Sequence, residues 1–139
     1  MAILGRARRI IAQVRPAIEA VFSAHGVDTG EFDVLATLLR SGPPYRLRPT
    51  ELYKTLMISF GGLSDRLARL AKAGLVSRHA AQDDARSLLV QLTERGGRTI
   101  EKAFREDMAL EADLLRPLSE QERRSLACLL RKLACSLDR

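Results

Sequence analysis

The segment 59–93 constrains the fold of this chain more than any other part of it. Its first half repeats leucine at the three- and four-residue spacing of one buried helical face, at Leu63, Leu67 and Leu70. Gly74 suits the end of that helix, because glycine readily adopts the left-handed conformation found there. The runs 75–79 and 87–92 then have the pattern of strands around a polar turn. The segment therefore predicts an amphipathic helix followed by a two-stranded hairpin.

Three helices are predicted before this segment. The first spans 3–24, where Pro16 should kink the helix, break it or mark the start of a second piece. The second spans 29–39, with Thr29 as its cap. A short third helix covers 50–57, because Pro49 suits a first helical position.

Two long helices are predicted after the hairpin. Thr93 caps the first of them, and Pro117 ends it. A capping box at 119–122 opens the second. Its apolar face consists of Leu126, Leu129, Leu130, Leu133 and Leu137. The terminal helices carry more apolar surface than one small chain can cover, which favours pairing with a second copy.

These elements predict a mainly α fold with a small β-hairpin. The two short helices before the hairpin form a helix-turn-helix, and the hairpin is its wing. We expect one domain over 1–139, in which 29–98 is the winged helix-turn-helix. The regions 1–25 and 99–139 are then dimerisation helices.

The positive charge of the chain is concentrated in the same region. The formal net charge is +6, and residues 45–98 contain ten basic and five acidic side chains. A basic surface over a helix and hairpin is typical of proteins that bind the phosphate backbone of nucleic acids. A basic surface that only keeps the protein in solution is the alternative.

The helix after Ser59 has residues suited to the major groove. The predicted contacts are Ser59, Gly61, Gly62, Ser64, Arg66 and Arg69. The serines can donate to phosphate or base, and the glycines let the backbone approach DNA closely. The arginines, three residues apart, can bind guanine or phosphate. The alternative is a surface helix whose arginines are only hydrated.

Acidic residues interrupt this basic surface. Asp65 can accept a hydrogen bond from cytosine, stabilise the helix N-terminus or hold Arg69 one turn further on, and we favour the two roles within the helix. At the hairpin tip, Asp84 can pair with Arg86 and aim its guanidinium into a narrow minor groove. An ordinary polar turn is the alternative there.

The chain resembles the MarR (multiple antibiotic resistance regulator) family from about Thr29 to its C-terminus. The resemblance is carried by PYRLRPTEL at 44–52, SFGGLSDRL at 59–67, LAKAGLV at 70–76, DAR at 84–86 and VQLTERG at 90–96. The chain departs from the family pattern at Arg48, where Ser or Thr is common, at Phe60, often a small polar residue, and at Asp65, often Lys, Asn or Arg.

The resemblance implies a homodimer in which the first and last helices interlock. Two winged domains would bind a pseudo-palindromic operator in double-stranded DNA, usually to repress transcription, and a small phenolic or other aromatic effector would release it. Thr50 is implied to contact phosphate. Arg86 is implied to enter the minor groove, with Asp84 as its supporting acid.

Other functions have little support in the sequence. It contains no nucleophile motif or phosphate-binding loop, so we expect no enzyme, and the spacing of its Cys and His residues predicts no metal or cofactor. Cys128 and Cys135 are interpreted as buried apolar residues, and a disulfide bridge between two subunits is the alternative. No apolar run is long enough for a membrane span, and we expect a cytoplasmic protein. The alternatives are a protein-interaction module with reduced DNA binding and a ligand-holding protein on the same scaffold.

Overall fold

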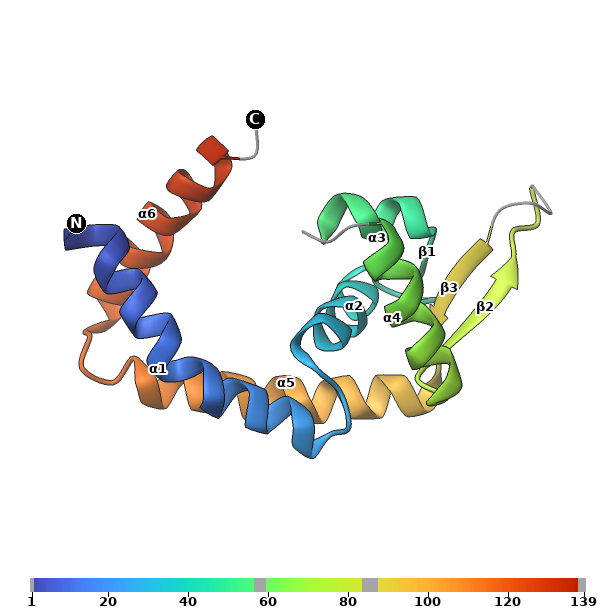
Figure 1. Cartoon of the computed structure of the whole chain (residues 1–139), viewed down its shortest axis with the longest axis horizontal. Coiled ribbons are helices and arrows are strands. Elements are labelled where there is room, and N and C mark those ends of the chain that lie inside the picture. Colours follow the sequence, from blue (N-terminus) through green and yellow to red (C-terminus); the bar gives the residue numbers. More distant parts are fainter. Residues whose placement is uncertain (1, 57–59, 84–87, 138–139) are drawn as a thin grey trace. The chain divides into compact units, whose positions relative to one another are not determined.

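The structure is a computed structural model that describes residues 2–56, 60–83 and 88–137 (Figure 1). Its elements are, in order, α1 (Ala2–Ala24), α2 (Thr29–Arg40), β1 (Arg46–Leu47), α3 (Pro49–Thr55), α4 (Phe60–Lys72), β2 (Val76–Ala80), β3 (Leu88–Leu92), α5 (Glu94–Leu114) and α6 (Glu120–Leu137). The prediction of a mainly α fold with a small hairpin is confirmed. The chain forms two compact units, Met1–Asp107 and Met108–Arg139.

The core of the first unit joins α2, α3 and α4 to the sheet (Figure 1). Its fully buried large side chains are Leu35, Leu38, Leu52, Leu63, Leu70, Ile100, Val34 and Val90. The leucine stripe predicted for α4 is therefore its buried face. Ile100, from the first half of α5, belongs to the same core.

The sheet has three strands, in the order β1-β3-β2, and both pairings are antiparallel. The hairpin was expected, but β1 was not. With only two residues, β1 is too short to show an alternating pattern in the sequence. Arg46 pairs with Gln91, and Gln91 pairs on its other side with Ser77, so one row crosses all three strands.

The helix ends follow the predicted signals with one correction. Thr93 caps α5, because its Oγ1 accepts a hydrogen bond from the Gly96 N–H at 2.9 Å. Gly74 has φ +75° and ends the turn after α4, as expected. The cap of α2 is Asp28 and not Thr29: the Asp28 carboxylate accepts from the Glu31 N–H at 2.7 Å. Asp and Thr both cap helices, so the sequence alone could not decide between these two adjacent residues.

Helix α1 is continuous through Pro16. The expectation of a break or of a second start there is therefore wrong. The end of α1 is attached to α2 by the rings of Phe22 and Phe32, which stack with centroids 4.1 Å apart. Its first half is mostly exposed and presents large apolar side chains to solvent, namely Ile3, Leu4, Ile10 and Ile11.

In the second unit, α6 begins at the predicted capping box. The Ser119 N–H donates to Glu122 at 2.8 Å, and the Glu122 N–H donates back to Ser119 Oγ at 3.2 Å. No residue of α6 is buried within the chain, and its leucine face is exposed. Cys128 and Cys135 are exposed as well, so the interpretation of buried cysteines does not hold for the single chain. None of the described helices is long and apolar enough to cross a membrane.

Candidate DNA-binding site

Helices α3 and α4 form the predicted helix-turn-helix. Leu52 of α3 and Leu63 of α4 are buried in the same core, which fixes the two helices against each other and against α2. Because 100° separates successive residues of a helix, the side of α4 opposite its leucines faces away from the core. That side is the one free to enter a groove of DNA.

The outward face of α4 consists of small residues with one acid and one base. Its members are all exposed: Gly61, Ser64, Asp65, Ala68 and Lys72. We call these five residues the outward face of α4. Of the predicted contacts on this helix, Gly61 and Ser64 lie on it, whereas Gly62 is half-buried at its side. Small side chains allow the backbone of this face to come close to base edges.

The structure turns Arg66 away from this face. Arg66 is half-buried, and its guanidinium lies against Gly30 of α2. A Cβ atom added to Gly30 would be only 2.5 Å from Arg66 Cζ, so glycine is what makes room for this side chain. Arg66 Nε is buried and has no hydrogen-bond partner among the described residues. Its predicted contact with DNA stays a prediction that requires the side chain to move.

Arg69 also has a partner on the protein. Its Nη2 lies 3.8 Å from Asp28 Oδ2, the carboxylate that caps α2. The expectation that Asp65 holds Arg69 is therefore not what the structure shows. Since both groups of the Arg69–Asp28 pair are more than half exposed, solvent screens it, and Arg69 remains able to turn to a phosphate.

Thr50 is predicted to contact phosphate, and the structure leaves it exposed. It is exposed at the second residue of α3, directly after Pro49. The residue before Pro49 is Arg48, whose N–H donates to Glu51 Oε1 at 3.1 Å. The N–H groups of Glu51 and Leu52 donate to the Arg48 carbonyl, so the exposed Thr50 is the residue at this helix end that can donate to a phosphate oxygen.

An ion pair that the sequence did not reveal joins α3 to the hairpin. Arg48 Nη2 donates to Asp83 Oδ2 at 2.6 Å, across 35 positions of the chain. Asp83 follows β2 and lies at the base of the hairpin tip. The pair therefore attaches the wing to the start of the helix-turn-helix. It also gives a role to the unusual arginine before Pro49.

Three predicted site residues lie outside the described residues. These are Ser59, which precedes α4 in the sequence, and Asp84 and Arg86, which lie between β2 and β3 in the sequence. Their roles remain predictions from sequence.

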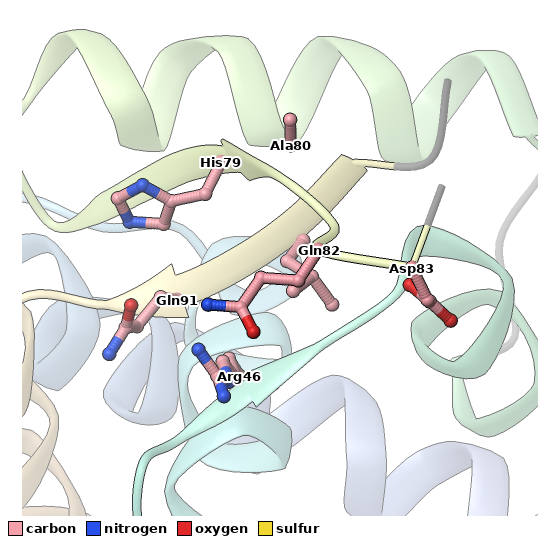
Figure 2. A pocket seen from close by; sticks show the side chains of 7 residues that line it. Arg46, His79, Ala80, Gln82, Asp83 and Gln91 are labelled. Carbon is pink, nitrogen blue, oxygen red and sulfur yellow. The ribbon is translucent and has the colours of Figure 1, made fainter. Parts of the chain in front are cut away.

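A hollow of about 500 Å³ lies on the sheet, lined by residues of β1, β2, β3 and the two residues Gln82 and Asp83. Figure 2 shows the Gln82 side chain extending toward Arg46, with His79 and Gln91 at one side and Asp83 at the other. Arg46 is exposed here, and its charge adds to the basic surface around the wing. Arg46 was not predicted as a site residue because the two-residue strand β1 has no signal in the sequence.

A second hollow, of about 360 Å³, lies between α1, α2 and α4. It is lined by Glu19, Ser23, Asp28, Thr29, Gly30 and Arg66. A third, of about 290 Å³, shares Glu19 and Thr29 with it and has an apolar wall of α1 residues, Ile11, Val14 and Ile18. The two hollows are therefore neighbours, one with a guanidinium and carboxylates and the other mostly apolar.

Partial burial changes the pKa of two carboxylates near these elements, Asp33 and Glu31. Loss of hydration raises the pKa of Asp33 above its ordinary value, although Arg40 and Arg66 act to lower it. Loss of hydration likewise raises the pKa of Glu31. No group of three or more His, Cys, Asp or Glu side chains suited to a metal ion occurs among residues 2–56, 60–83 and 88–137.

The chain is similar to known transcriptional regulators. The MarR family profile matches residues 25–87. The HTH-type transcriptional regulator PecS of Dickeya dadantii is 38% identical over 130 residues, which is 94% of this chain and 78% of PecS.

Solved structures have the same fold. A mutant of MarR from E. coli complexed with operator DNA matches with a TM-score of 0.81 and 28% identity, over 94% of this chain and 92% of that one. An organohalide-sensing transcriptional regulator in its 2,4-dichlorophenol-bound form matches with a TM-score of 0.77 and 20% identity, over 93% of this chain and 78% of that one.

Proposed function

The chain belongs to the MarR family of DNA-binding transcriptional regulators, and we propose that it acts as a homodimeric repressor on a pseudo-palindromic operator. Members of this family are regulators and not enzymes. The observation that carries the proposal is the outward face of α4, whose residues are exposed and mostly small. Thr50 of α3 and Arg46 of β1 are exposed in the same compact unit. A regulator of this kind works where operator DNA is, so the proposal includes a cytoplasmic location.

Specific binding is proposed to use the three parts together. The outward face of α4 enters the major groove, Thr50 donates to a phosphate, and Arg86 of the wing reaches the minor groove. Support for the wing contact comes from the Arg48–Asp83 pair, which attaches the wing base to α3.

The homodimer is supported by exposed apolar side chains in both terminal helices. In α6 they are Leu126, Leu129, Leu130, Leu133 and Leu137, which repeat at three and four residues and are 40–75% exposed. A helix with such a stripe and no buried residue needs a partner, because the stripe is costly to leave in water. A second copy is the partner that also supplies two reading helices for a two-fold operator.

The dimer can be tested by placing a charge on this stripe. Leu130→Asp should weaken self-association by tenfold or more, on the order of the 1.5–3 kcal/mol that burial of a leucine supplies. Cys128→Asp is the matched control, because it introduces the same charge on the opposite side of α6.

Sedimentation velocity measures both variants and the native chain. A monomeric Leu130→Asp variant beside a dimeric control supports the proposal, and a native chain that sediments as a monomer contradicts it.

We propose that a small phenolic or other aromatic effector binds between α1, α2 and α4. The unpartnered Arg66 Nε can donate to a phenolate or carboxylate oxygen, while the ring contacts the apolar wall that includes Ile11 and Ile18. Because Arg66 belongs to α4, a ligand that holds it would favour one position of the reading helix over others. A bound phenol in the organohalide-sensing relative supports this ligand class.

The effector proposal is tested with 2,4-dichlorophenol added to preformed protein–DNA complexes in a gel-shift titration. Release from the native chain but not from Arg66→Gln, at protein concentrations that give equal starting occupancy, supports it. Equal release from both removes Arg66 from the ligand site.

A further inference from the structure

Asp65 has no structural role in the described fold. It is exposed on the outward face of α4, and no described residue forms an ion pair or hydrogen bond with its carboxylate. It lies beyond the first turn of α4, which contains no acidic residue, so the helix dipole gives it little stabilisation. Arg69, its neighbour one turn on, is placed against Asp28.

Asp65 also has a longer side chain than its neighbours on the outward face of α4. Its neighbours there are Gly61, Ser64 and Ala68, which are all small. Arg66 is turned toward α2 and Arg69 is paired with Asp28, so neither is paired with Asp65. With small residues around it, the Asp65 carboxylate is in a position to meet base edges when the outward face of α4 enters a major groove.

A carboxylate can only accept hydrogen bonds, and this limits the base it can read. In the major groove, guanine presents two acceptors and thymine one acceptor and a methyl group. Adenine has an amino donor, but its N7 acceptor lies beside it and repels a carboxylate. Cytosine presents its N4 amino donor alone.

We propose that Asp65 is a specificity-determining residue that accepts a hydrogen bond from the N4 amino group of a cytosine in each operator half-site. This inference rests on the proposed function as a DNA-binding regulator. Where no cytosine is present, the same carboxylate repels the DNA and weakens non-specific binding. Asp65 thus lowers the affinity for DNA in general and creates a preference for cytosine at one base pair.

The test is selection from a pool of duplexes with a randomised central region, followed by titration of single duplexes. Native protein should enrich a motif with one required cytosine per half-site. Replacing that cytosine should weaken binding about fivefold or more, the lower end of the range for a specific base contact. Asp65→Ala should lose this difference and bind random duplex more tightly. Asp65→Asn should accept adenine there, because asparagine pairs with its N6 and N7.

Glu101→Gln is the control, since it removes the same charge from an exposed position on α5. Its motif should equal that of the native chain. The inference is overturned if Asp65→Ala keeps the cytosine preference. It is also overturned if the substitution changes the affinity for every duplex by the same factor, whatever its sequence. If the native protein enriches no sequence, the proposed function itself fails, and the inference falls with it.

Discussion

Arg48 and Asp83 give the most detailed prediction, because their pair joins two parts of the proposed DNA-binding surface. The perturbation is a double-mutant cycle of Arg48→Ala, Asp83→Ala and the double variant. Single variants are ambiguous, since removing Arg48 also removes a cation near DNA and removing Asp83 removes a repulsive anion. The cycle cancels these separate effects and leaves the coupling between the two side chains.

The expected magnitude follows from the exposure of the pair. The 2.6 Å contact is short, but the side chains are 35% and 70% exposed, so solvent screens much of the attraction. Exposed pairs contribute about 0.2–1 kcal/mol to folding stability. If the pair holds the wing in its binding position, operator binding should show a coupling of up to about 1 kcal/mol, or fivefold in Kd.

Fluorescence anisotropy with a labelled operator duplex measures the four dissociation constants. The Glu94–Arg98 pair of α5, also exposed and with its charged atoms 3.4 Å apart, provides a control cycle away from the wing. We expect no coupling in that cycle. An Arg48–Asp83 coupling as small as the control value would refute the claim that the pair positions the wing.

Three further predictions follow from packing and burial. Gly30→Ala should push the Arg66 guanidinium out of its hollow, which changes the melting temperature little but abolishes the response to 2,4-dichlorophenol in the gel-shift assay. Gly96→Ala should destabilise the fold by about 1–3 kcal/mol in urea unfolding, because its Cβ would overlap the backbone carbonyl of Leu75 and backbone cannot move aside cheaply. Loss of hydration raises the pKa of Asp33 in the folded state. Its ionisation therefore lowers the stability of the fold as the pH rises from the unfolded-state pKa through the folded-state pKa. Asp33→Asn should therefore be more stable than the native chain at neutral pH, and unfolding curves at about pH 3 should show a smaller difference.

Much of the fold could be predicted from the sequence because its signals are local. The leucine spacing of α4, the glycine after it and the capping box of α6 are each contained in a few residues, and each is confirmed. Strand β1 was missed because two residues carry no periodicity, and its partner Gln91 is far along the chain.

The site was predicted less completely because its geometry depends on long-range contacts. Arg66 was expected to face DNA on the basis of its place in α4. Its actual direction depends on Gly30, which leaves space for a guanidinium on another helix. The Arg48–Asp83 pair likewise joins residues that only the folded chain brings together.

The most direct test of the central claim is binding of the purified protein to the DNA upstream of its own gene, compared with random duplex, at about 50 mM and about 200 mM salt. The account predicts tighter binding to the upstream DNA, with an affinity that falls steeply with salt as counterions are released. Equal binding to both duplexes, or binding insensitive to salt, would contradict it. That result would favour the alternative, a protein-interaction module on a winged-helix scaffold.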